Sequence, residues 1–478
     1  MAELVEKRAF LTGHTCRTGG WHVHHAAEEA LGPGLKWRFY FGADVGRRAR
    51  HWLGGGRYVR RTPLDAALRE TEEAVREGGD LLFEASFVWG GLTARADALR
   101  RAPDGWTVIE IKSGLSPKED YIDDLAYTVC VARGAGLPVT GAALVLINRE
   151  YRIGGDAPMF VEVDQTAEAL DRATALRENA QEVARTISAE QRPDPILIFF
   201  CKSCGLFETE CLGRDIPDPL FVLPRLSEKK FAELRDYERV SRIPSGANLT
   251  APQQRVAEVI RSGREYVDLA ALRVLDEIVW PVHYLDFETI NPYLPWFEGR
   301  PPYDAVAFQY ALCVRREPGA PPEHHEYLAG STGDWRRELT EQLLADLGTQ
   351  GSIVAYSSAE KTHLNVLAGL FPDLQEPLRA AAARIFDLER VFKDGYVHPG
   401  FAGRTSIKKV LPVLVKDVSY DRLAIGGGDD ALGTFAFMRV GEYPPETHEA
   451  HRAHLLEYCA LDARAMLELH DVLLRIRN

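Results

Sequence analysis

The chain has 478 residues and a hydrophobic fraction of 46%, enough for two or three folded domains, which excludes a disordered or collagen-like protein. Its 57 Lys and Arg against 70 Asp and Glu give a net charge of −13, which argues against a simple basic nucleic-acid coat. Residues 1–61 differ, with eleven Lys and Arg against five Asp and Glu. No apolar run reaches the roughly 20 residues of a membrane span. Residues 1–10 lack the apolar core of a signal peptide, so we expect a cytoplasmic protein with no membrane partner.

Hydrophobic periodicity and turn residues divide the chain into three regions. In residues 1–215, helices are expected at 64–77, 118–132 and 166–188, and strands at 81–88, 91–100, 106–112 and 142–148. A mostly helical connector interrupted by prolines is expected over 216–279. Residues 280–478 show strands at 282–287 and 352–356 and a long helix at 448–475. The sequence therefore predicts two α/β domains joined by a helical connector.

Two acids and a lysine lie at the ends of two strands that a turn at 102–105 joins into a hairpin. Glu110 and Lys112 fall on one face of the second strand, because side chains alternate along a strand. Asp97 lies thirteen residues before Glu110, a separation that a hairpin can close. Paired carboxylates are hard-oxygen ligands for Mg²⁺ or Mn²⁺, and the lysine can stabilise charge on a phosphate. A salt-bridged strand end without catalytic use is the alternative.

Asp97 followed by Glu110-x-Lys112 resembles the PD-(D/E)xK nucleases, and the order of the surrounding elements resembles their RecB-like branch. The resemblance implies a restriction-endonuclease-like fold, with Glu84 in a supporting role and His51 as a further metal ligand. Thr128 stands where this branch often has glutamine. The resemblance places a basic helix and a later aromatic residue against nucleic acid, so we expect Arg47, Arg48, Arg50 and Tyr127 to contact it.

Four cysteines of the first region are unevenly distributed: Cys16 lies near its start, and Cys201, Cys204 and Cys211 lie close together near its end. Four thiolates suit an iron–sulfur cluster or a zinc ion, and His14, His22, His24 or His25 offers a replacement ligand in a zinc site. The one-plus-three arrangement is similar to the RecB-like nucleases with a four-iron, four-sulfur cluster, including AddB and the CRISPR-associated RecB-like exonucleases. That resemblance implies a cluster joining the two ends of the domain. The other three cysteines are expected to be ordinary buried thiols: Cys130, Cys313 and Cys459.

The third region carries acids in three places. Asp286 and Glu288 end an apolar strand on one face, and Tyr458 and Asp462 share a helix face at i, i+4. Between them, Glu360 follows the strand at 352–356. These motifs resemble the DEDDy subgroup of the DnaQ-like exonucleases, whose fold is RNase H-like. The resemblance implies metal binding by the four acids and a role for Tyr458 on the attacking water. Glu360 replaces an aspartate, and His363 and Asp387 are alternatives.

The pair of modules resembles bacterial proteins that fuse a RecB-like nuclease to a DEDDy exonuclease, over 1–215 and 280–478. It implies a two-site metal-dependent nuclease, acting on DNA rather than RNA in repair or defence, with a separate helicase or defence-system partner. One alternative is a nucleic-acid-binding or assembly protein whose sites are degenerate, favoured by Thr128 and Glu360. Another is an RNA 3′–5′ exonuclease that uses only the second module.

Overall fold

The computed structural model describes residues 4–27 and 31–478, and the chain folds into two compact units. Unit 1 comprises Met1–Ala30, Arg38–Arg214 and Pro292–Asp304, of which 4–27 are described in the first segment. Unit 2 comprises Leu31–Trp37, Asp215–Asn291 and Ala305–Asn478. A short segment near the N-terminus, Leu31–Trp37, therefore belongs to unit 2, and a short segment of the C-terminal half, Pro292–Asp304, belongs to unit 1. Domain boundaries at 215 and 280 alone do not predict this exchange of segments.

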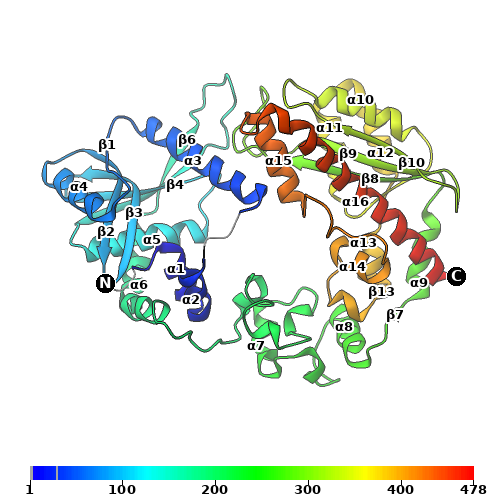
Figure 1. The fold of residues 1–478 in the computed structure, drawn as a ribbon, viewed down its shortest axis with the longest axis horizontal. Helices are drawn as coiled ribbons and strands as arrows, with labels where there is room; N and C mark the ends of the chain where they lie inside the picture. Colours follow the sequence, from blue (N-terminus) through cyan, green and yellow to red (C-terminus); the bar gives the residue numbers. More distant parts are fainter. Residues whose placement is uncertain (1–3, 28–30) are drawn as a thin grey trace. The chain divides into compact units, whose positions relative to one another are not determined.

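Unit 1 is built on a six-stranded sheet in sequence order (Figure 1). The second to fourth strands form an antiparallel meander, and the fourth and fifth are parallel. The turn at 102–105 joins two strands as the sequence predicts, with Ala102 paired to Gly105. The strands are β1 Arg57–Tyr58, β2 Leu81–Trp89, β3 Leu92–Ala102, β4 Gly105–Lys112, β5 Val139–Ile147 and β6 Phe160–Asp164.

Helices cover the sheet of unit 1 because each presents an apolar stripe. In α6 (Thr166–Ile187), the buried residues Ala169, Ala173, Leu176 and Ala180 recur at helical spacing. This helix packs on α5 (Glu119–Gly134), which contacts β2 to β5, and on α1 (Lys7–Thr15) and α2 (Arg17–His25). A separate core cluster joins α3 (Pro33–Leu53) to the sheet, and α4 (Leu64–Arg76) packs on β2.

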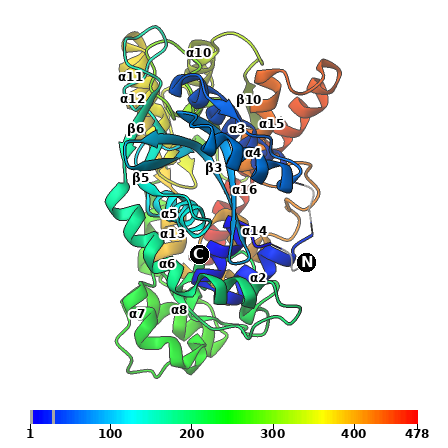
Figure 2. The same ribbon diagram turned by 90° about the vertical axis from the view of Figure 1, so that its left-hand side faces the viewer.

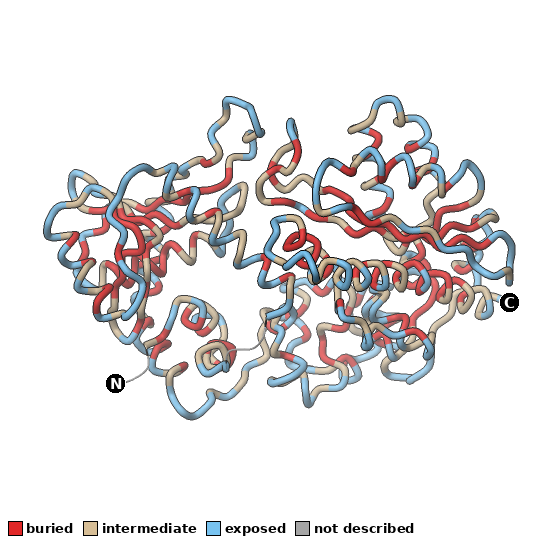
Figure 3. The backbone as a smooth tube through the Cα atoms, turned by 45° about the horizontal axis from the view of Figure 1, so that its top comes forward, coloured by how far each residue is buried: buried red, intermediate tan, exposed pale blue. Residues whose placement is uncertain are grey.

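Unit 2 contains a five-stranded sheet in the order β10-β9-β8-β11-β12. Figure 1 labels β8, β9 and β10 of this sheet, and Figure 2 shows β10 from the side. The first three strands of this order are antiparallel, whereas β8, β11 and β12 are parallel. Every residue of β9 is buried, so helices cover both faces of the sheet (Figure 3). The strands are β8 Val282–Ile290, β9 Val306–Arg315, β10 Glu323–Leu328, β11 Ser352–Ala355 and β12 Ile385–Asp387.

Two neighbouring residues of β9 show which helices lie on the two faces. The Gln309 side chain donates to the Leu455 carbonyl of α16 (His448–Arg477) at 2.7 Å. Tyr310 points the other way and donates to Asp346 of α10 (Arg336–Leu347) at 2.6 Å. The long helix therefore crosses one face of the sheet, where it packs on β8 and β9. Its buried residues lie against β8, the strand that contains Asp286 and Glu288.

The expected connector at 216–279 lies within unit 2. It holds α7 (Glu228–Leu234), α8 (Ala251–Ser262) and α9 (Leu269–Leu272), separated by short 3₁₀ turns. Its β7 (Tyr266–Val267) pairs with β13 (Tyr396–Val397), and Leu272 and Leu275 enter the same apolar core as β8. This pairing and burial explain why the segment does not act as a free linker. None of the described helices is long and apolar enough to cross a membrane.

Candidate active sites

The β3–β4 hairpin brings Asp97 beside Glu110 and Ile111. Ala98 pairs with Ile109, and the Ile111 amide donates to Oδ2 of Asp97 at 2.8 Å. Glu110 is buried, and Lys112 lies on the same face with its Nζ 3.8 Å from Oε2 of Glu110. The structure therefore brings Asp97, from the middle of β3, together with Glu110 and Lys112 at the end of the paired strand β4.

Three further groups complete this site. Nζ of Lys7, at the start of α1, donates to Oε1 of Glu110 at 2.9 Å. The Thr128 hydroxyl donates to the same oxygen at 2.6 Å, and Asp124 forms an ion pair with Lys112. Asp124 and Thr128 are four residues apart on α5, so one helix face supplies both. Thr128, which stands where the RecB-like branch often has glutamine, thus contacts the candidate site directly.

The two carboxyl groups differ in their protonation. Burial, followed by repulsion from Glu110, raises the pKa of Asp97 to about 7. Burial also opposes ionisation of Glu110, but the Lys7 and Lys112 ammoniums hold the pKa of Glu110 below its ordinary value. A divalent cation between the two would relieve the repulsion and keep both ionised. The donor set, two carboxylates beside a lysine, thus fits one hard cation and a phosphate.

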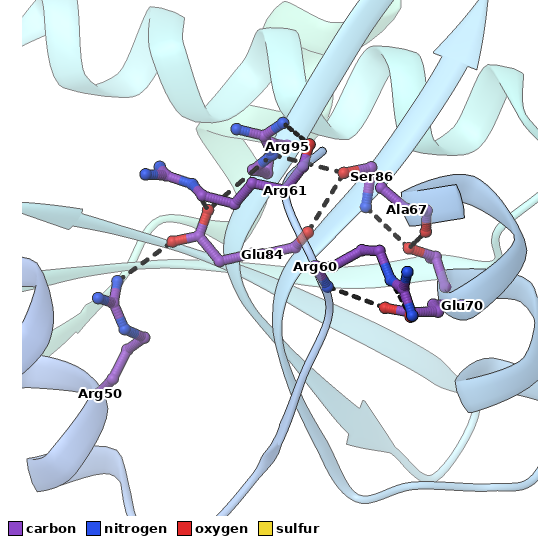
Figure 4. Close-up of polar contacts among 9 residues, drawn as sticks. Arg50, Arg60, Arg61, Ala67, Glu70, Glu84, Ser86 and Arg95 are labelled. Carbon is purple, nitrogen blue, oxygen red and sulfur yellow. Dashed lines mark hydrogen bonds and ion pairs between the residues drawn. The ribbon is translucent and has the colours of Figure 1, made fainter. Parts of the chain in front are cut away.

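Glu84 sits in β2 with a left-handed backbone (φ 61°) and is 2% exposed. Its carboxylate meets Arg50 at 3.2 Å, Arg61 at 3.0 Å and Arg95 at 3.9 Å (Figure 4). One buried carboxylate therefore orients three guanidiniums and leaves the group with excess positive charge. This arrangement gives Glu84 a supporting role toward arginines that are at least partly exposed.

The other predicted contact residues of unit 1 fare differently. Arg47 and Arg48 are exposed on α3 and pair with Asp44. His51 is exposed on the last turn of α3, and within the described residues it makes no hydrogen bond or ion pair to Asp97 or Glu110. Tyr127 is fully buried, and its hydroxyl donates to the Thr93 carbonyl at 2.8 Å. The expectation that Tyr127 contacts nucleic acid is wrong, because this ring faces the core.

In unit 2, ligand oxygens of Asp286, Glu288 and Asp462 all lie within 4.8 Å of one another. They form the one such group of at least three His, Cys, Asp or Glu ligands among residues 4–27 and 31–478. Asp286 and Glu288 come from β8 and Asp462 from α16, which packs on that strand. Three converging carboxylates are the donor set that Mg²⁺ and Mn²⁺ favour.

Glu360 lies near this trio at the start of α11 (Ala359–Leu370) and is 7% exposed. Its charge contributes to the raised pKa of Asp286, although it stands outside the group of three. The Ser357 hydroxyl lies 3.4 Å from Oε2 of Glu360. The two alternatives are less well placed: the His363 ring meets the Phe287 ring, and Asp387 accepts from the Arg390 amide. Glu360, whose charge acts on Asp286, stays the predicted fourth acid.

Without a bound cation, the carboxylates of the unit 2 cluster repel one another strongly. Burial and then repulsion from Asp462, Glu288 and Glu360 raise the pKa of Asp286 well above its ordinary value. Burial and Asp462 likewise raise the pKa of Glu288 to about 8, and burial raises that of Glu360 to about 7. All these shifts favour the protonated forms, so bound protons or a divalent cation would neutralise the charge of the cluster.

Three residues that the motifs did not identify as site residues complete the surroundings of the trio. Tyr420 donates to Oδ1 of Asp462. Lys408, in the first turn of α14 (Ile407–Leu414), places its ammonium 5.2 Å from the ring centres of both Tyr420 and Tyr458. Its charge opposes the rise in the pKa of Glu288. Cys459 is buried as expected, but its Sγ lies 3.4 Å from Oδ2 of Asp286. In the sequence, the one indication that Cys459 belongs to the site is its position between Tyr458 and Asp462 in the motif.

The four predicted cluster ligands are free thiols in the same region of unit 1. Cys16 caps α2, and Cys201, Cys204 and Cys211 follow α6. Burial raises the pKa of Cys201, and the Cys16, Cys211 and Cys204 thiols raise it further. No three of these sulfurs lie within 4.8 Å of one another in the described structure. Tetrahedral zinc, with Zn–S about 2.3 Å, would require sulfurs about 3.8 Å apart.

Comparison with known proteins gives two family matches, in separate parts of the chain. No curated protein and no solved structure matches the chain. Residues 283–406, which contain Asp286, Glu288 and Glu360, match a domain of unknown function (DUF2779). Residues 24–208, which contain Asp97, Glu110 and Lys112, match the family model of the PD-(D/E)XK nuclease superfamily.

Proposed function

We propose that the protein is a metal-dependent nuclease with two phosphodiesterase sites, one in each unit, that acts as a DNA exonuclease. The observation that carries the first site is that the superfamily match at 24–208 coincides with the assembled Asp97, Glu110 and Lys112. At this site a bound Mg²⁺ or Mn²⁺ would supply Lewis-acid activation of the phosphate. Asp97 and Glu110 would hold the ion, and Lys112 would bind the phosphate oxygen.

For the second site, we propose a DEDDy exonuclease on an RNase H-like fold. The strand order of unit 2, with three antiparallel strands followed by two parallel ones, supports that fold. The convergence of Asp286, Glu288 and Asp462, with Glu360 nearby, supports a cluster able to hold two cations. The buried Tyr458 lies one helical turn before Asp462, in the position to orient a water.

The test is digestion of 5′- and 3′-labelled DNA and RNA with Mg²⁺ or Mn²⁺. We expect D97A and D286A each to remove one part of the cleavage pattern by at least about 10²-fold, and the double variant to remove both. Product ladders from each labelled end give the polarity that each site uses. Unchanged cleavage by the double variant would overturn the proposal, and EDTA is the metal-free control.

One observation favours the alternative of a binding or assembly protein with a degenerate first site. Lys7 and Lys112 both lie within ion-pairing distance of Glu110, so amino groups already neutralise a proposed metal ligand. Metal-independent binding of DNA without cleavage would support that alternative. If only D286A removes cleavage, and matched RNA is degraded faster than DNA, the second site acts alone as an RNA exonuclease.

We further propose that Cys16, Cys201, Cys204 and Cys211 hold a four-iron, four-sulfur cluster. Support comes from four free thiols that join α2 to the end of the unit 1 chain and lie close enough for Cys16, Cys211 and Cys204 to raise the pKa of Cys201. We expect anaerobically purified protein to be brown, with broad absorption near about 400 nm that C201S abolishes. C130S, a buried thiol elsewhere in the unit, should leave the colour unchanged. Colourless protein with one zinc per chain would contradict the assignment.

The remaining proposals concern the cellular context. A cytoplasmic setting suits seven free cysteines, because thiols of this kind persist in a reducing compartment. A DNA exonuclease acting in repair or defence needs access to strand ends, which a separate helicase or a defence-system partner would provide. Copurification with and without D97A tests whether such a partner binds independently of cleavage.

A further inference from the structure

A pocket of about 470 Å³ lies within unit 2 at the start of α8, away from the carboxylate cluster. Its other wall comes from α13 (Glu389–Asp394) and the segment that leads to α14. Apolar side chains, including those of Val256, Phe392 and Phe401, form part of the lining. This volume falls in the range of small-molecule sites, about 300–1,000 Å³. The charged lining residues are four cations and one acid: Arg225, Arg255, Lys393, Arg404 and Asp394. Lys393 already forms an ion pair with Glu389 at 2.6 Å, so an anion would be bound by arginine side chains of the lining.

Arg225 reaches this pocket from a strained backbone. Its φ of 50° lies in the left-handed region, where a residue with a side chain is uncommon and glycine is favoured. The residue is exposed, so burial of its side chain does not account for arginine at this position. A positively charged residue kept in a glycine-like conformation at a pocket indicates a ligand for that charge.

Arg255 is the second cation of the pocket lining that the structure places in detail. Its Nε is buried and has no hydrogen-bond partner in the described part of the chain, and its guanidinium lies 5.7 Å from the Tyr266 ring. Protein atoms close the Nε off from the pocket, and the aromatic ring holds the charged guanidinium at the pocket wall. The start of α8 is already closed by a capping box between Thr250 and Gln253, so the cationic side chains carry the recognition.

We propose that this pocket binds a nucleotide, with its phosphate beside Arg225 and Arg255 and its base against the apolar lining. A free mononucleotide and the terminal nucleotide of a strand share this chemistry. A short chain segment connects the pocket to the second site. Gly403, Arg404 and Thr405 line the pocket, and Lys408, beside the carboxylate cluster, follows four residues after Arg404. Binding itself does not depend on cleavage, so this proposal stands apart from the proposed nuclease function.

The test is titration of the full chain with a fluorescent nucleoside monophosphate in EDTA, where neither carboxylate site can bind metal. We expect one site per chain, weakened at least about tenfold in R225G and in R225E. R225G is the sharper variant, because glycine suits φ 50°: its thermal unfolding midpoint should equal or exceed that of the parent while binding is lost. A fall in stability together with unchanged binding would mean that Arg225 is merely structural and would overturn the proposal.

Two matched controls and two competitors complete the design. R235Q, an exposed arginine outside the pocket, and D286N should bind the probe as the parent does. Competition by unlabelled mononucleotide alone identifies a free nucleotide as the ligand, whereas competition by a short oligonucleotide identifies a strand end. No binding up to about 5 mM probe, or equal binding by R225E, would overturn the proposal. The outcome is independent of whether either site cleaves DNA.

Discussion

The D286N variant should lose the cleavage that the second site performs, by about 10³-fold or more, and yet unfold at a higher temperature than the parent at pH 8 without metal. The physical reason is that burial and three neighbouring carboxylates raise the pKa of Asp286, so its charge is unfavourable in the folded apo protein. Asparagine keeps the shape and removes that charge. Activity and stability therefore move in opposite directions at this position.

The same carboxylates should make the stability of the metal-free protein depend on pH. Folded-state pKa values of about 8 for Glu288 and about 7 for Glu360 exceed the ordinary 4.5. Between pH 4.5 and 8 the folded chain therefore binds more protons than the unfolded chain, and its contribution to stability falls as pH rises. We expect Mn²⁺ to restore the unfolding midpoint of the parent at pH 8, because the ion binds only the folded cluster. In D286N both effects should shrink.

The measurement is thermal unfolding from pH 5 to pH 8, with and without Mn²⁺, for parent and variant. D417N is the matched control, since Asp417 is an exposed aspartate of the same unit, and it should follow the parent. The difference between parent and variant isolates the cluster from other titrating groups, such as His283 and His470. A D286N variant that is less stable at pH 8 and still responds to Mn²⁺ would contradict a metal cluster.

At the first site, K112A in the D286A background should lower the remaining cleavage rate by about 10²–10⁴-fold with little change in DNA binding. Lys112 stands between Glu110 and Asp124, and these two charges raise its pKa even though burial opposes its charge. The amine is therefore held protonated beside the proposed metal ligands. A fixed cation of this kind stabilises negative charge that develops on phosphate in the transition state.

The assay for this lysine is single-turnover cleavage with saturating enzyme, so that the rate reports the chemical step and a separate titration reports affinity. K118A, an exposed lysine just before α5, is the control and should cleave like the background protein. K112R should not restore the rate, because guanidinium differs from ammonium in shape and hydrogen-bonding geometry. A K112A rate equal to the background would remove Lys112 from the chemistry.

Much of the candidate chemistry was predictable because it depends on local geometry. Alternation along β4 and β8 places Glu110 with Lys112, and Asp286 with Glu288, on shared faces whatever the rest of the chain does. The hairpin turn after β3 fixes the neighbourhood of Asp97 in the same way. His51 and Tyr127 were harder to place, because the side of the sheet that a helix covers, and the side chains that it buries there, depend on packing partners far along the chain.

The sequence by itself determined the positions of the strand-end acids and the i, i+4 pair of Tyr458 and Asp462, because strand and helix periods are properties of the backbone. Only the tertiary structure decided that Lys7 reaches Glu110, 103 residues away, and that Lys408 and Tyr420 surround Asp462. It also decided that Tyr127 is a core residue. These contacts join elements without a shared repeat or spacing, so their positions follow from how helices pack on the two sheets.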